Sequence, residues 1–211
     1  MGINERKERE RNNRRRLILE AAEHVYLKEG YHSTTMEKIA EMAELSRAAI
    51  YLHFKTKNEI FVHAVVSFLE HFRNLIEDLY ERREYVGEDL LKEVWNIFEK
   101  LYLEEPEALN ATNYFLQSDM IRNLPDDLRL LIDHAGIRTH DSLFRIIKYG
   151  ASRDYFGEYD PKRLAEILWT CFLGVVNFEN SKKAMGRKDH FNINCKVIYD
   201  ILSKGILSRG V

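Results

Sequence analysis

Apolar side chains recur every three or four residues along most of the chain, which is the spacing of one face of an α-helix. Residues 57–83 show this pattern most clearly, because neither glycine nor proline interrupts it. Other segments repeat the spacing or begin at a residue suited to cap a helix. Further helices are predicted at residues 14–28, 35–43, 46–52, 88–104, 106–121, 125–149, 161–185 and 189–207.

The three prolines of the chain support this assignment. Pro106, Pro125 and Pro161 each stand where a predicted helix begins and follow a plausible capping residue; the first turn of a helix tolerates proline. No segment shows the alternating pattern of a strand convincingly. We therefore predict an all-α fold of about nine helices, in which an N-terminal three-helix unit is followed by a larger helical bundle.

Composition and cysteine usage are ordinary for a globular protein, with 45% hydrophobic and 31% charged residues. No run of about 18 apolar residues could span a membrane, and the N-terminus lacks the apolar stretch of a signal peptide. A cytoplasmic location without a membrane partner is expected. Cys171 and Cys195 form neither a metal motif nor a disulfide framework, so we expect two reduced thiols within helices, no metal and no cofactor.

The net charge of −2 argues against nucleic acid as a partner, but the charge is unevenly distributed. Residues 5–16 hold seven basic and three acidic side chains, a net charge of +4, so that the remaining chain carries −6. A basic end on an acidic body is expected where one end meets phosphate. A solvated charged tail explains the same residues equally well.

No arrangement typical of an enzyme is present in the sequence. The eight histidines include no HExxH zinc motif, and the chain has no glycine-rich phosphate loop and no GxSxG nucleophile turn. His134 and His140 are six residues apart and therefore do not share a helix face. The sequence predicts a protein that is not an enzyme.

Residues 35–54 form the segment that indicates a function. Two short helices are joined by a tight turn near Glu44 and Leu45, and the small Ala40 stands where the helices cross closely. Because such a pair buries too little apolar surface to be stable alone, the helix at 14–28 must pack beneath it. This arrangement is a helix-turn-helix, whose second helix enters the major groove of DNA.

Residues 18–64 resemble the DNA-binding domain of the TetR family of bacterial regulators. The residues that carry the resemblance are Ala21-Ala22, Gly30-Tyr31, Thr35, Ile39-Ala40, Ser46, the run Tyr51-Leu52-His53-Phe54, and Lys57. One departure is Glu44, which stands in the turn where the family usually has glycine. If this position needs a positive φ, glutamate costs about 1 kcal/mol relative to glycine.

Contacts with the phosphate backbone are expected from four residues. Thr35 stands at a helix N-terminus, where its hydroxyl and backbone N–H suit a phosphate, and the resemblance implies phosphate contacts for Tyr51, His53 and Lys57. Such contacts set register and affinity but do not read sequence. Packing alone is the alternative for Tyr51, and an ordinary surface position is the alternative for His53.

Contacts with the bases are expected from the second helix of the motif. Arg47 is the candidate for reading guanine, and small apolar side chains suit thymine methyl groups. The residues on or near the groove face are Ser46, Arg47, Ala48, Ala49 and Leu52. For Ser46, capping alone is the alternative. The arginines of residues 5–16 either reach flanking phosphates or the minor groove, or remain solvated.

The resemblance also divides the chain into two domains. Residues 1–56 would hold a basic arm and the helix-turn-helix, and residues 57–211 a ligand-binding and dimerisation domain. The implied cavity would suit a small hydrophobic or aromatic ligand, although an ordinary core explains each aromatic side chain as well. The candidate ligand-binding residues are Trp95, Phe98, Tyr102, Tyr114, Phe115, Phe144, Trp169 and Phe172.

A homodimer is the further implication of the resemblance, with the last two helices pairing with their copies across a two-fold axis. Residues with suitable helical spacing are Leu168, Phe172, Val175, Val176, Ile193, Val197, Ile201 and Leu202. The expected protein is a repressor, the default of the family, which releases a palindromic operator when a ligand binds. The alternative is a DNA-binding dimer without a small-molecule ligand, controlled by a protein partner or by its expression level.

Overall fold

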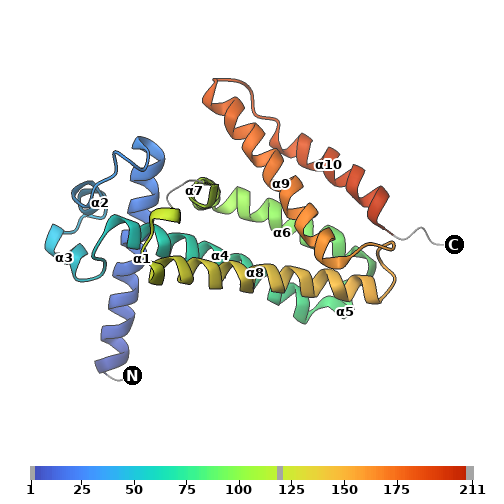
Figure 1. The fold of residues 1–211 in the computed structure, drawn as a ribbon, viewed down its shortest axis with the longest axis horizontal. Coiled ribbons are helices and arrows are strands. Elements are labelled where there is room, and N and C mark those ends of the chain that lie inside the picture. Colours follow the sequence, from blue (N-terminus) through green and yellow to red (C-terminus); the bar gives the residue numbers. More distant parts are fainter. Residues whose placement is uncertain (1–2, 118–120, 208–211) are drawn as a thin grey trace. The chain divides into compact units, whose positions relative to one another are not determined.

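The computed structural model describes residues 3–117 and 121–207, and within these ranges the regular structure is helical (Figure 1). The only strand-like pairing there is one isolated antiparallel bridge between Phe156 and Leu207. The α-helices are α1 (Ile3–Glu29), α2 (Met36–Met42), α3 (Arg47–Tyr51), α4 (Lys57–Glu81), α5 (Arg83–Val86), α6 (Leu90–Glu104), α7 (Pro106–Gln117), α8 (Asp126–Ser152), α9 (Pro161–Ala184) and α10 (Phe191–Ile206). Short 3₁₀ turns are η1 (Gly87–Asp89) and η2 (Ile121–Asn123). The all-α fold class is confirmed.

The predicted helices correspond to the observed ones, with three differences. The helix expected at 57–83 ends at Glu81, and the single turn α5 follows it. The helix expected at 106–121 is described as far as Gln117, because residues 118–120 lie outside the described ranges. The first helix begins at Ile3 instead of residue 14, so residues 5–16 lie within α1, and their role as a basic arm stays a prediction.

The early start of α1 has a physical reason in its composition. Glutamate, arginine and lysine are good helix formers, and the ion pairs Arg6–Glu10 and Arg16–Glu20 have the i,i+4 spacing that supports a helix. The charged residues 5–16 therefore lie along a helix surface. Charge density alone suggested a tail, although these residue types also form helices well.

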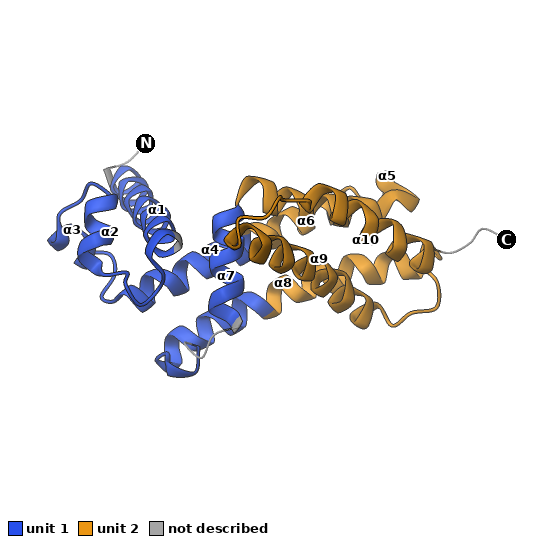
Figure 2. Ribbon diagram, turned by 90° about the horizontal axis from the view of Figure 1, so that it is seen from above, with its two compact units in different colours: residues 1–70, 106–136 blue, residues 71–105, 137–211 orange. Residues whose placement is uncertain are grey.

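The chain divides into two compact units, which Figure 2 colours separately. Residues 1–70 and 106–136 form unit 1, and residues 71–105 and 137–211 form unit 2. The boundary expected after residue 56 stays a prediction. None of the helices in the described ranges is long and apolar enough to span a membrane.

In unit 1, α1, α2 and α3 enclose one apolar cluster with the start of α4. The residues buried together are Ile18, Ala21, Ala22, Met36, Ile39, Ala40, Ile50, Phe54 and Ile60. The paired alanines of α1 and Ala40 of α2 have the smallest side chains in this cluster, which lets the helix backbones approach closely. The helix-turn-helix is thus held on α1, as its small size requires.

The cysteines lie where the sequence suggested. Cys171 is half-buried in α9, Cys195 is buried in α10, and neither is part of a disulfide. Burial, with Glu99 and Glu179 nearby, raises the pKa of the Cys195 thiol to about 12, so this thiol stays protonated at neutral pH.

The turn between α2 and α3 has a left-handed residue at Glu44, whose φ is +54°. The backbone N–H of Glu44 donates to Glu41 O at 3.1 Å, and that of Leu45 donates to Ala40 O at 2.9 Å. These two bonds form the Schellman ending, in which glycine is preferred at the left-handed position. Glu44 therefore carries the backbone strain that the sequence anticipated.

Replacing Glu44 by glycine should raise the free energy of unfolding by about 1 kcal/mol, because glycine adopts a positive φ without a Cβ clash. Urea unfolding followed by circular dichroism measures the change. The matched control is Glu41→Gly, which introduces glycine within α2 at an ordinary helical position and should lower stability by about 0.5–1 kcal/mol. Loss of stability in both variants would contradict the strain argument.

Candidate nucleic-acid interface

Two N-caps define where the short helices of the motif begin. Thr35 caps α2, and its Oγ1 accepts the backbone N–H of Lys38 at 3.3 Å. Ser46 caps α3, and its Oγ accepts the backbone N–H of Ala49 at 3.1 Å. Thr34, one residue earlier, is buried, and its hydroxyl donates to Gly30 O at 2.8 Å.

One face of α3 is buried and the other is open to solvent. Ile50 is fully buried against α1 and α2. Arg47 and Ala48 are exposed, Ala49 is half-buried, and Leu52, at the end of the helix, is 80% exposed. This exposed apolar side chain at the end of a short helix suits contact with a thymine methyl group.

Arg47 is held in place by neighbours on both short helices. Its Nη2 lies 2.9 Å from Oε1 of Glu37 in α2, and its guanidinium carbon lies 5.6 Å from the centre of the Tyr51 ring. Hydrogen bonding to Tyr51 and the charge of Glu37 raise the pKa of Arg47. The Arg47–Glu37 ion pair is exposed to solvent and is therefore weak. It orients the guanidinium, but Arg47 can leave Glu37 and bind the edge of a base instead.

Lys57 has a structural role that sequence reasoning missed. Its Nζ donates to Tyr31 O and to Thr34 O, both at 3.0 Å, and lies 4.4 Å from the centre of the Tyr31 ring. Burial lowers the pKa of Lys57. The ammonium therefore ties the loop before α2 to the start of α4. One feature of the sequence could have indicated this role. Lys57 is the first residue of a predicted helix, and the loop before α2 offers carbonyl groups that have no partner within a helix.

Arg15 also has a structural role that the sequence did not reveal. Its Nη1 donates to His53 O at 3.0 Å, and its guanidinium lies 4.2 Å from the centre of the Phe54 ring. This contact joins α1 to the segment after α3, so at least this arginine is not part of a solvated tail.

His53 lies among positive charges at the end of the motif. Burial and the charges of Arg15, Arg11 and Arg14 lower its pKa, and its Nδ1 is buried without a hydrogen-bond partner in the described structure. The imidazole is therefore mostly neutral at pH 7. The arginines around it present positive charge on the same side of the molecule as the loop after α3, where a phosphate would be attracted.

The aromatic residues expected to bind a ligand are distributed over both units. In unit 2, the rings of Phe98, Trp169 and Phe172 lie 5.2–5.7 Å apart between centres, and Trp95 lies 6.0 Å from Phe172. These rings pack against one another as a core. Tyr102 stacks on Phe191 at 3.9 Å.

The remaining three residues are Phe144 of unit 2 and Tyr114 and Phe115 of unit 1. Phe144 is half-buried and lies beside Lys148. Tyr114 and Phe115 belong to unit 1, where Tyr114 is half exposed beside Tyr26 and Phe115 is buried. The ligand-binding role of all eight residues stays a prediction.

Residues 18–64 match the family described as "Bacterial regulatory proteins, tetR family". The chain is 32% identical to YvkB, an uncharacterized HTH-type transcriptional regulator of Bacillus subtilis (strain 168), over 63% of this chain and 78% of YvkB. The chain belongs to the TetR family. Similarity to YdgC of the same organism, also an uncharacterized HTH-type regulator, extends further, with 26% identity over 93% of this chain and 94% of YdgC.

This TetR-family chain shares its fold with solved structures. The fatty acid degradation regulator FadR from Bacillus halodurans superimposes with a TM-score of 0.73 at 21% identity, covering 93% of this chain and 97% of FadR. The protein is therefore a DNA-binding transcriptional regulator with a helix-turn-helix, and not an enzyme. The recognition made from the motif residues is confirmed.

Substitutions at Lys57 and Arg47 should weaken DNA binding in different ways. Lys57→Ala should weaken binding to all duplexes alike, and should lower the free energy of unfolding by about 1 kcal/mol because two hydrogen bonds to carbonyls are lost. Arg47→Ala should leave stability unchanged and reduce discrimination roughly tenfold or more at one base pair of each half-site. Fluorescence anisotropy with a panel of singly substituted duplexes measures both effects. A uniform loss for Arg47→Ala would show that Arg47 contacts only phosphate.

Proposed function

We propose that this TetR-family regulator is a cytoplasmic repressor that binds a palindromic operator as a homodimer and releases it when a small, largely apolar molecule binds the region 57–211. The observation that carries the DNA-binding part is the capped α2–α3 pair, which is fixed on α1 and exposes one face of α3. Its proposed phosphate contacts are Thr35, Tyr51, His53 and Lys57. Its proposed contacts on the groove face are Ser46, Arg47, Ala48, Ala49 and Leu52.

The dimer is supported by an uncovered apolar stripe on α9 and α10. On α10, Ile193, Val197 and Ile201 recur at helical spacing, and on α9 Ile167 and Phe178 lie on one face; these five side chains are 49–62% exposed. Exposed apolar side chains that recur on one face of a helix are typical of a protein interface. Cys171 and Gly174 are the small residues between the two exposed positions of α9, where a partner helix could approach closely.

Three of the residues expected at the dimer interface lie elsewhere. Leu168, Phe172 and Val176 are almost fully buried in the chain's own core, so the apolar face of α9 available to a partner is the one with Ile167 and Phe178. Helical spacing identifies apolar faces, and α9 has two of them. Only the packing of the folded chain shows which of the two is already covered by its own core.

A two-fold dimer should select a two-fold DNA site. Selection of duplexes from a random pool should recover an inverted repeat whose half-site centres are about 10–10.5 base pairs apart or a multiple of that. The double variant Val197→Asp/Ile201→Asp should be monomeric by light scattering at micromolar concentration, because two unpaired charges would be buried in each copy.

The matched control for this variant is Leu130→Asp/Ile137→Asp on α8, two side chains exposed to a similar degree outside the stripe. This control should remain dimeric and should retain the selected site. A monomeric wild-type protein, or a selected site without inverted symmetry, would contradict the proposed operator mode.

Release of DNA by a ligand requires that the ligand and the operator each weaken the binding of the other. If a ligand weakens operator binding a hundredfold, a coupling of about 2.7 kcal/mol, the operator must weaken ligand binding by the same factor. A molecule retained by the purified protein would be identified by mass spectrometry after denaturation and then titrated with and without operator. Equal ligand affinity in the two titrations would contradict the sensor role.

A regulator without a small-molecule ligand is the second candidate function. The close packing of the unit 2 rings onto one another favours it, because these side chains already satisfy each other as a core. Under this alternative, no molecule would be recovered from the denatured protein, and operator affinity would depend only on a protein partner or on the concentration of the dimer.

A further inference from the structure

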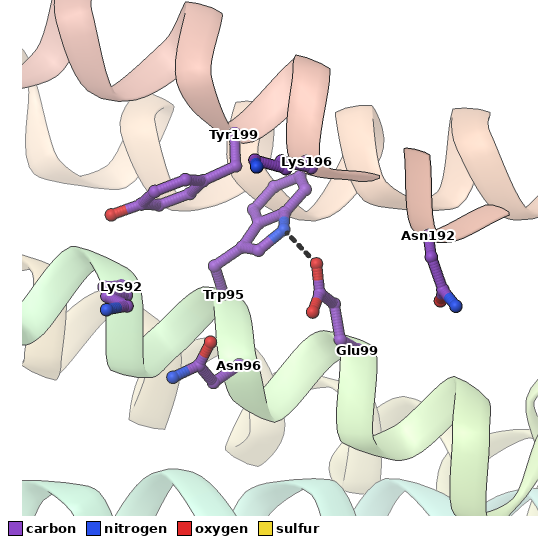
Figure 3. A pocket seen from close by; sticks show the side chains of 7 residues that line it. All are labelled: Lys92, Trp95, Asn96, Glu99, Asn192, Lys196 and Tyr199. Carbon is purple, nitrogen blue, oxygen red and sulfur yellow. Dashed lines mark hydrogen bonds between the residues drawn. The ribbon is translucent and has the colours of Figure 1, made fainter. Parts of the chain in front are cut away.

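A pocket of about 310 Å³ lies between α6 and α10 in unit 2, outside the packed aromatic core (Figure 3). Its walls come from one face of each helix, since the lining positions follow the spacing of successive helical turns. The lining residues are Lys92, Trp95, Asn96 and Glu99 of α6, and Asn192, Lys196 and Tyr199 of α10. A volume near 300 Å³ is at the small end of ligand sites, which suits a ligand of one or two rings.

Two aromatic rings form the inner wall of this α6–α10 pocket. The centres of the Trp95 and Tyr199 rings lie 5.9 Å apart, with their planes inclined at 43°. Trp95 is only 3% exposed, and its Nε1 donates to Oε1 of Glu99 at 2.9 Å, as Figure 3 shows. The indole is therefore held in one orientation. Tyr199 is half-buried, so its ring is the one that a flat ligand could reach.

The residues that line the pocket have a net positive charge, although Asp89 and Asp200 lie close enough to act on Tyr199. Lys92 comes from α6 and Lys196 from α10, as Figure 3 shows, and both are exposed. Within the described residues, neither ammonium group forms an ion pair with a carboxylate. Glu99 is the single acidic residue of the lining, and one of its oxygens is occupied by the indole N–H. Two ammonium groups against one carboxylate favour an anion.

We propose that the α6–α10 pocket binds a small aromatic carboxylate, with its ring against Tyr199 beside Trp95 and its carboxylate toward Lys92 and Lys196. The amide of Asn96 lies in the same lining and can donate to a carboxylate oxygen. This ligand differs from a purely apolar one, because a neutral ring would give the two lysines no charge partner.

The pocket and the exposed stripe use different faces of α10. Asn192 and Lys196 each precede by one residue a member of the stripe, Ile193 and Val197 respectively. One residue corresponds to about 100° around a helix, so the two faces point in different directions.

The direct test uses 2-naphthoate as the probe and the indole N–H signals of the full-length ¹⁵N-labelled protein. The chain has two tryptophans, Trp95 and Trp169, so Trp169→Phe or Trp95→Phe assigns the two signals, and either variant is sufficient. Saturable movement of the Trp95 signal is expected, because its N–H lies in the pocket wall. Movement of the Trp169 signal alone would place the probe in the aromatic core and overturn the proposal.

The charge requirement is tested with two comparison probes of the same ring size. 2-Naphthalenemethanol, which is neutral, should bind at least tenfold more weakly than 2-naphthoate. 2-Naphthylmethylammonium, which is cationic, should bind more weakly still. Equal affinity for the neutral probe, or preference for the cation, would overturn the assignment of an anion site.

The role of the two lysines is tested by Lys92→Gln/Lys196→Gln, which should weaken 2-naphthoate binding about tenfold or more and leave the neutral probe unaffected. The matched control is Lys100→Gln/Lys188→Gln, which removes the same charge from exposed positions outside the lining and should leave both affinities unchanged. Equal weakening in the two double variants would show a general charge effect and overturn the proposed site.

Discussion

The surface that meets DNA depends on the burial of two very short helices against α1. Helices α2 and α3 have seven and five residues, lengths at which an isolated helix does not persist in water. Their stability therefore comes from the cluster that includes Ile18, Ile39 and Ile50. Among the proposed DNA contacts, Ala48 and Leu52 lie on the side of the helix opposite Ile50, so the same burial that stabilises the motif also decides which side chains face outward.

Polar contacts then fix the details that apolar packing leaves open. Thr35 and Ser46 set the starting points of the two helices, and Lys57 holds the loop between α1 and α2 through Tyr31 O and Thr34 O. Glu44 accepts a left-handed conformation in the turn. The motif tolerates this strain because the surrounding Schellman bonds and the packing of Leu45 over-determine the turn.

The α9–α10 hairpin of unit 2 is organised around a buried carboxylate. Glu179 is fully buried. Its carboxylate accepts hydrogen bonds from Lys182 Nζ at 2.8 Å, from the backbone N–H of His190 at 2.8 Å and from Asn194 Nδ2 at 2.6 Å. A buried charge is tolerated only when it is paired and hydrogen-bonded in this way. These bonds join the end of α9 to the start of α10 and so hold together the two helices that carry the exposed stripe and one wall of the α6–α10 pocket.

The sequence by itself determined the all-α class, the positions of nine helices and the family, because helical spacing, N-caps and the motif residues from Ala21 to Lys57 are local signals. It also identified Glu44 as a residue that departs from the glycine usual in the family's turn, and the structure supplied its positive φ. Only the tertiary structure decided that residues 5–16 continue α1, that Lys57 and Arg15 bind backbone carbonyls, and which apolar face of α9 is free. The contacts of Lys57 and Arg15 depend on partners far away in the chain, Tyr31 for Lys57 and His53 for Arg15, and side-chain periodicity carries no information about distant partners.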